Sequence, residues 1–282
     1  MSKRQIRQVL VGRPTRDGDG VALTRVFDSQ HAALFDPFLM LDEFGSDAAD
    51  DYIGGFPPHP HRGFETVTYM LEGRMLHEDH LGNRGLLEPG GLQWMTAGRG
   101  IIHSEMPRQQ SGRMRGLQLW VNLPARDKLQ PAGYRDLPPE ALAEHRRADG
   151  SLLRLLAGRL DIDGQQLLGP ISDRPSQPLL LDIQLSANAE LCVPLPESLN
   201  ALLYVLDGQL RVDDRPLRAQ QLAHLGSGTQ LQLDSPDSAA RALLIAGQPI
   251  GEPIAQYGPF VMNTREEIEQ AISDYRRGRL TD

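Results

Sequence analysis

Short apolar segments separated by glycine and proline turns constrain the fold of this chain more than any other feature. The clearest segment, FETVTYML at 64–71, is rich in β-branched and aromatic residues and is soon followed by Gly73. This pattern is typical of a β-strand that ends in a turn. We expect further strands at 7–11, 22–27, 35–44, 75–81, 92–96, 100–105 and 115–123. Their spacing predicts a β-barrel or a β-sandwich.

The second half of the chain repeats this pattern after a break. Residues 124–150 hold four prolines among charged residues and are expected to connect two blocks, with a short helix at 139–147. A second β-rich block is expected at 151–247. Its segment ALLYVLDG at 201–208 resembles TVTYMLEG at 66–73, and this faint repeat indicates two copies of one β unit.

The C-terminal segment has a different character. Between 264 and 279 its acidic residues come early and its arginines late, and Thr264 can cap the N-terminus. This order predicts a helix, because it matches the charges to the helix dipole. Apart from this helix and the short one at 139–147, we expect an all-β chain with two domains, at 1–130 and 131–282.

Composition excludes several classes of function. The net charge is −8, from 29 basic and 37 acidic residues, without a dense basic run, so direct binding to nucleic acid is not expected. Cys192 is the only cysteine, which excludes an internal disulfide and a cysteine-based zinc site. No apolar run reaches the roughly 18 residues of a membrane span, and the start lacks the apolar stretch of a signal peptide. We expect a cytoplasmic protein.

Two pairs of polar residues carry the chemistry of this sequence. Prolines on both sides of His59 force extended backbone, so His59 and His61 face the same side. His103 and Glu105 are also two residues apart on an expected strand. If the strands lie near each other, three imidazoles and a carboxylate converge, a donor set that suits Fe, Mn, Ni, Cu or Zn. The plainer alternative is a set of ordinary surface or core histidines.

The stretches HPHRGFETVTYMLEG and TAGRGIIHSEMP, together with the later FVMNT, resemble the pirin family of bicupins. The likeness covers the whole chain and is strongest from about 36 to 123. It implies two cupin domains, each a double-stranded β-helix or jelly-roll sandwich, with Fe2+ in the N-terminal domain alone. The family's iron ligands match His59, His61, His103 and Glu105 of this sequence, with Mn, Ni, Cu or Zn as alternative metals.

Glu65 is a rival for the fourth ligand position. In ordinary cupins a glutamate a few residues after H-x-H binds the metal, and Glu65 occupies that place in phase with His61. The last histidine of those cupins would fall near Trp94, which cannot bind a metal. The pair His103 and Glu105 is therefore expected to complete the site, with Glu65 as a hydrogen-bond acceptor beside it or a buried acid.

The other candidates for a site are weaker. His77 and His80 lie near a hairpin turn and are expected in solvent, and His31 in a loop. His145 and His224 are far apart in the second block, which therefore has no metal cluster of its own. Cys192 is expected to be a core thiol.

The resemblance implies an enzyme. Bacterial proteins similar to this chain are associated with quercetin 2,3-dioxygenase activity, the oxygen-dependent opening of a flavonol ring with release of carbon monoxide. The substrate is then a small aromatic molecule such as a flavonol, and Glu105 or Glu65 takes the proton of its hydroxyl group. Phe56, Trp94 and Met106 are candidate pocket walls, or plain core residues.

The alternative is a regulator. Pirins of other organisms are described as partners of transcription factors or metabolic enzymes, with the oxidation state of iron as a switch. An acidic chain would suit a basic partner, although the sequence has no partner motif. A third hypothesis is a cupin that keeps its metal without specific turnover, because flavonols chelate any open iron site.

Overall fold

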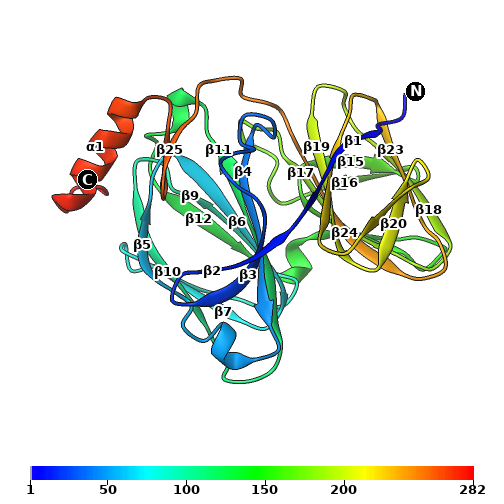
Figure 1. Cartoon of the computed structure of the whole chain (residues 1–282), viewed down its shortest axis with the longest axis horizontal. Coiled ribbons are helices and arrows are strands. Elements are labelled where there is room, and N and C mark those ends of the chain that lie inside the picture. Colours follow the sequence, from blue (N-terminus) through cyan, green and yellow to red (C-terminus); the bar gives the residue numbers. More distant parts are fainter. Residues whose placement is uncertain (1) are drawn as a thin grey trace. The chain divides into compact units, whose positions relative to one another are not determined.

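The computed structural model describes residues 2–282, which form two compact units. The first, here called the histidine unit, consists of residues 13–139 and 250–282. The second, here called the leucine unit, consists of residues 2–12 and 140–249. Each unit is built almost entirely of antiparallel strands (Figure 1).

In the histidine unit a seven-stranded sheet, in the order β12-β9-β6-β11-β4-β3-β2, accompanies a four-stranded sheet, β5-β10-β7-β8. Figure 1 shows β6, β11 and β4 side by side in the larger sheet. The strands are β2 (Arg13–Asp17), β3 (Val21–Phe27), β4 (Phe38–Ser46), β5 (Phe56–His61), β6 (Phe64–Glu72), β7 (Met75–Asp79), β8 (Arg84–Leu87), β9 (Leu92–Thr96), β10 (Ile101–Pro107), β11 (Met114–Asn122), β12 (Gly133–Leu137), β25 (Ala255–Tyr257) and β26 (Phe260–Met262).

The leucine unit repeats this plan. Its sheets have the orders β1-β22-β19-β24-β17-β14-β13 and β18-β23-β20-β21, and β15 pairs with β16. The strands are β1 (Ile6–Val11), β13 (Ala143–Arg146), β14 (Leu152–Ala157), β15 (Arg159–Ile162), β16 (Gln165–Leu168), β17 (Leu179–Leu185), β18 (Ala189–Pro194), β19 (Asn200–Asp207), β20 (Gln209–Val212), β21 (Arg215–Arg218), β22 (Gln221–Leu225), β23 (Gln230–Ser235) and β24 (Ala240–Gly247).

The two strand orders confirm the internal repeat predicted from the sequence. Residues 66–72 lie in β6 and 201–207 in β19, a glycine follows each strand, and each strand is third in its seven-stranded sheet. The predicted C-terminal helix is also confirmed. It is α1 (Arg265–Arg276), the one α-helix within residues 2–282, and Thr264 and Glu267 form a capping box at its start.

Each unit contains a terminal segment that is separated in sequence from the rest of that unit. β1 pairs antiparallel with β22 at the edge of the leucine unit, and residues 250–282 return to the histidine unit as β25, β26 and α1. The domains predicted from the sequence, 1–130 and 131–282, are continuous stretches. They therefore differ from the two units in the assignment of residues 2–12 and 250–282.

The helix expected at 139–147 is wrong. Pro139–Ala141 form only a 3-10 turn. Two other 3-10 turns lie earlier in the chain, at Ala49–Asp51 and Ala125–Asp127. Ala143–Arg146 form strand β13, which pairs with β14 from Leu152 onward. Pairing with a neighbouring strand overrides the weak helical tendency of this short segment.

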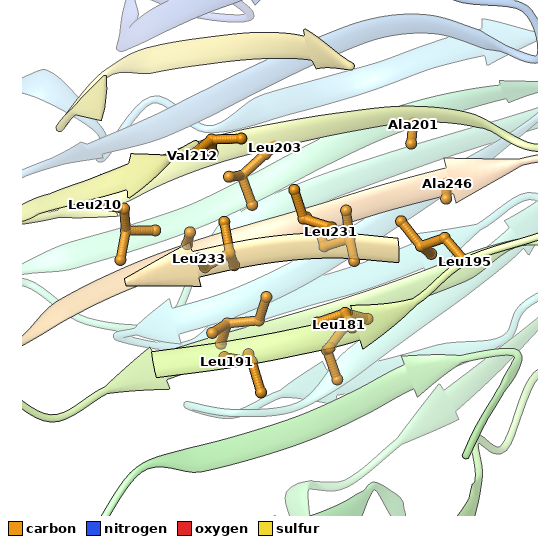
Figure 2. Packing of buried hydrophobic residues seen from close by; sticks show 14 of the residues in the cluster. Leu181, Leu191, Leu195, Ala201, Leu203, Leu210, Val212, Leu231, Leu233 and Ala246 are labelled. Carbon is orange, nitrogen blue, oxygen red and sulfur yellow. The ribbon is translucent and has the colours of Figure 1, made fainter. Parts of the chain in front are cut away.

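The interiors of the two units differ. In the leucine unit one cluster joins both sheets, with Leu181 and Leu203 of the larger sheet against Leu191 and Leu231 of the smaller one (Figure 2). In the histidine unit several smaller apolar clusters are found instead, one of them around Phe44. This unit also buries polar side chains, among them His61, His77, His103 and Glu105. None of the helices among the described residues is long and apolar enough to cross a membrane.

Candidate metal centre

The antiparallel pairing of β5 and β10 brings three of the four predicted ligands together, His59, His61 and His103. His103 lies opposite His59, and Ile101 opposite His61. One ring nitrogen from each of His59, His61 and His103 lies within 4.8 Å of the other two. The ring centroids are 4.4 Å apart for His59 and His103 and 4.9 Å apart for His61 and His103. Three imidazoles therefore converge, as expected from the sequence.

Burial favours the neutral form of two of these rings, His61 and His103. Burial lowers the pKa of His61 well below the usual imidazole value, and the nearby His59 lowers it further. Burial also lowers the pKa of His103 well below that value. The buried Nδ1 of His61 and Nε2 of His103 have no hydrogen-bond partner in the described residues. Neutral lone pairs without a partner are what a divalent transition metal requires of histidine ligands.

The remaining nitrogens hold the rings in place. Nδ1 of His59 lies 2.8 Å from the carbonyl oxygen of Pro57. The His61 ring donates to the backbone carbonyl of Pro259. Nδ1 of His103 lies 2.8 Å from Nε2 of His77. Histidine ligands are commonly fixed in this way through their second nitrogen.

Glu105 is not part of this group of three, but it is buried, with only 2% of its surface exposed. Thr68 donates a hydrogen bond of 3.1 Å to Oε1, and Gln118 one of 2.9 Å to Oε2. Both donors are neutral, and no described residue forms an ion pair with this carboxylate. A buried carboxylate is costly without a cationic partner, so a metal cation beside the histidines suits this position.

Glu65 does not point toward the histidines. It lies on β6 three residues before Thr68, so the two side chains project from opposite faces of the strand. Thr68 contacts Glu105, whereas Glu65 accepts a 2.7 Å hydrogen bond from Thr96 on the other face. The inward orientation expected for Glu65 is therefore corrected, although its predicted burial is confirmed.

His77 is the residue that sequence reasoning missed. It was expected in solvent, but its exposed fraction is 0% and its ring contacts His103. Burial lowers its pKa despite the nearby carboxylates of Glu105, Asp136 and Asp79. Burial does not alternate along β7, since Met75, Leu76 and His77 are all buried, so the pattern of this strand gave no signal for His77. His80 is exposed as expected.

The other predicted residues lie outside the group. His145 pairs with Asp163 at 3.1 Å and His224 with Asn200 at 2.9 Å. Residues 2–282 contain no second group of three potential metal ligands. Cys192 is exposed rather than in the core, because it lies at an outward position of β18, where buried and exposed residues alternate.

A cavity of about 660 Å³ opens beside the histidines, within the size range of ligand sites. His59 and His61 line it together with the aromatic residues Phe44, Phe56 and Trp120. Of the three predicted pocket walls only Phe56 lines this cavity, since Trp94 and Met106 are not among its lining residues. Trp94 is completely buried.

The C-terminal segment supplies another wall of the cavity, residues 256–259. Two buried cations hold this segment next to His61. Arg62 donates 2.8 Å hydrogen bonds to Asp274 and to the carbonyl of Leu280. Lys128 donates to the carbonyls of Gly63 and Val261, and burial lowers its pKa to about 8.

Known proteins resemble this chain over nearly its whole length. Residues 20–121 match the family model described as Pirin, and residues 180–281 the one described as Pirin C-terminal cupin domain. A Pseudomonas aeruginosa protein, named provisionally as a quercetin 2,3-dioxygenase, is 55% identical over 281 residues, 98% of each chain. A pirin-like protein of Caulobacter vibrioides is 47% identical over 280 residues, 99% of this chain and 100% of that protein.

A solved structure extends the likeness to three dimensions. The crystal structure of quercetin 2,3-dioxygenase from Acinetobacter baumannii matches with a TM-score of 0.90 and 32% identity, covering 99% of each chain. The strand orders, the two family models and these relatives lead to one conclusion. The chain, with its two cupin domains, belongs to the pirin family.

Proposed function

We propose that this protein is a mononuclear metalloenzyme of the quercetin 2,3-dioxygenase type. The observation that carries the proposal is the group of three converging histidines beside an aromatic cavity of about 660 Å³. The names of the relatives from Pseudomonas aeruginosa and Acinetobacter baumannii support the same reaction.

The proposed ligands are His59, His61, His103 and Glu105, and the proposed ion is Fe2+. A donor set of three imidazoles and one carboxylate accepts Mn, Ni, Cu or Zn as well. One carboxylate and three neutral rings leave a divalent ion with a net positive charge, which would favour a bound flavonol in its deprotonated form. When bound, such an ion polarises the substrate and activates it toward oxygen.

The residues of the chain have three roles in this proposal. Phe44, Phe56 and Trp120 present apolar surfaces that suit a flat aromatic molecule. Glu105, through Oε1 or Oε2, would accept the proton of the flavonol hydroxyl, while Thr68 and Gln118 hold its carboxylate in place. The wall at 256–259 would limit access of water.

The test combines metal analysis with turnover of quercetin on the same samples. Protein purified without added metal is compared with His61→Ala and Glu105→Ala, and with His224→Ala as a control in the leucine unit. We expect about one equivalent of iron per chain, lost with quercetin turnover in both site variants and kept in the control.

Other outcomes distinguish the alternatives. Metal retained by Glu105→Ala would remove Glu105 from the ligand set. Normal metal binding without turnover would exclude the enzyme and favour the redox-sensing regulator. A panel of flavonols and unrelated chelators tests the third hypothesis. Equally low catalytic efficiency with all of them would favour a metal-binding cupin that has no specific substrate.

A further inference from the structure

We propose that His77 is a positioning residue for the metal site. It accepts a hydrogen bond from Nδ1–H of His103 and thereby leaves the lone pair of His103 Nε2 for the metal. This inference rests on the metal site in the proposed function, but not on the identity of the metal or of the substrate.

The contact between the two rings carries the argument. Nε2 of His77 and Nδ1 of His103 are 2.8 Å apart, which is hydrogen-bond distance. Their exposed fractions are 0% and 1%. Two neutral imidazole nitrogens at this distance share one proton, so one ring donates and the other accepts.

The direction of donation decides whether His103 can bind a metal. If His77 donated, the proton of His103 would be on Nε2, and this nitrogen could not be a ligand. If His103 donates, its proton is on Nδ1 and Nε2 keeps a lone pair. Nε2 of His103 has no hydrogen-bond partner in residues 2–282, so the second arrangement alone makes it available to an ion.

The surroundings of His77 fix its ring. On β7 it pairs with Glu105 of β10, one of the strands that carry the site. Its ring packs against Tyr134 of β12 in a T-shaped contact, with centroids 4.8 Å apart. A completely buried ring that packs on an aromatic neighbour can direct a second ring, because its own acceptor cannot move far.

His103 differs from the other two histidines in this respect. The rings of His59 and His61 bond to backbone carbonyls of Pro57 and Pro259, which no side-chain substitution removes. The second nitrogen of His103 contacts a side chain instead. The orientation of His103 is therefore the one that a single substitution can change.

The experiment compares His77→Leu, His77→Gln and the matched control His80→Leu, each in the full-length chain. Leucine removes the acceptor, whereas glutamine can place its carbonyl oxygen near the position of Nε2. The affinity for Ni2+ is measured by competition with a chelator of known affinity. We expect a 10- to 100-fold loss in His77→Leu, with most of the affinity restored in His77→Gln and none lost in His80→Leu.

The second measurement needs no metal and uses the wild type together with the two His77 variants. In metal-free protein labelled with 15N-histidine, nitrogen chemical shifts report which nitrogen of His103 carries the proton. We expect the proton on Nδ1 in the wild type and in His77→Gln, and a loss of this preference in His77→Leu.

Three results would overturn the inference. They are wild-type affinity in His77→Leu, a loss in His77→Gln as large as in His77→Leu, and a wild-type His103 protonated at Nε2. Turnover of quercetin is not among the readouts. If the proposed reaction proved wrong, the role of His77 could still be correct. Conversely, normal turnover of quercetin would not support that role if the metal affinity and the protonation of His103 contradicted it.

Discussion

The two cupins of this chain have the same strand order, but their smaller sheets bury different kinds of side chain. The strands β5 and β10 of the histidine unit correspond in sheet order to β18 and β23 of the leucine unit. The first pair carries buried imidazoles and a buried carboxylate. The second buries mainly apolar side chains, among them Leu191, Val193, Leu231 and Leu233, with Ser235 as a buried polar residue. One scaffold thus supports either a site or a continuous core.

The difference has an energetic consequence. Burial of a leucine side chain contributes about 1.5–3 kcal/mol to folding. Buried ring nitrogens without hydrogen bonds, such as Nδ1 of His61, oppose folding unless an ion binds them. We therefore expect the leucine unit to be stable without a metal and the histidine unit to depend on one.

The largest expected effect is in the leucine unit. Leu203→Ala should lower the free energy of unfolding by about 3 kcal/mol, because Leu203 is completely buried between the sheets and its truncation leaves a cavity. Denaturation by urea measures the loss. The control is Leu168→Ala, since Leu168 is 55% exposed. Equal effects of the two substitutions, or loss of metal in Leu203→Ala, would contradict the separation of core from site.

Removal of the metal should affect the other unit. An ion present at about 100-fold its dissociation constant stabilises a folded protein by about 2.7 kcal/mol. Treatment with a chelator should therefore speed hydrogen exchange in β5 and β10 and leave β18 and β23 unchanged, as measured by mass spectrometry. Similar changes in both pairs of strands would show that the units do not differ in this way.

The metal-free histidine unit should also lose stability in acid. Burial depresses the folded pKa of His61 and His103 below the usual value of 6.5, so the unfolded chain takes up protons first as the pH falls. Stability is then lost below about pH 6.5, by about 1.4 kcal/mol per pH unit for each ring. Urea denaturation at pH 7.5 and 5.5 measures this loss. The difference should be smaller in His61→Ala, and an unchanged difference would exclude this origin.

The smallest effect concerns α1, the helix that follows the cavity wall in the chain. Thr264→Ala should lower the free energy of unfolding by about 1 kcal/mol, because the Thr264 hydroxyl caps α1 by accepting a hydrogen bond from the backbone N–H of Glu267. Hydrogen exchange in α1 should increase, whereas exchange in the leucine unit should not. Faster exchange throughout the chain would show that this helix stabilises more than the histidine unit.

Local patterns predicted most strands and the histidine group, because strand alternation and proline geometry act over a few residues. The same alternation predicted the wrong face for Glu65. Between His61 and Glu65 the chain passes from β5 in one sheet to β6 in the other. Gly63 lies at that passage with φ of +90°, a conformation that favours glycine. The phase of the strand therefore does not continue across it.

Two features depended on partners that are distant in the sequence. His77 is buried because β7 pairs with β10 and because Tyr134 packs on its ring. The assignment of residues 2–12 to the leucine unit depends on the pairing of β1 with β22. Such long-range pairings leave little trace in the local pattern, so neither feature could be derived from composition or spacing.

The return of residues 250–282 to the histidine unit also sets an order of events during synthesis. A ribosome makes residues 13–139 early, yet the pocket wall at 256–259 and the partners of Arg62, Asp274 and Leu280, come from the last part of the chain. The leucine unit, whose residues end at 249, is therefore fully translated before the histidine unit is. The pocket can therefore be completed only after residues 256–280 have been made, which is later than the whole of the leucine unit.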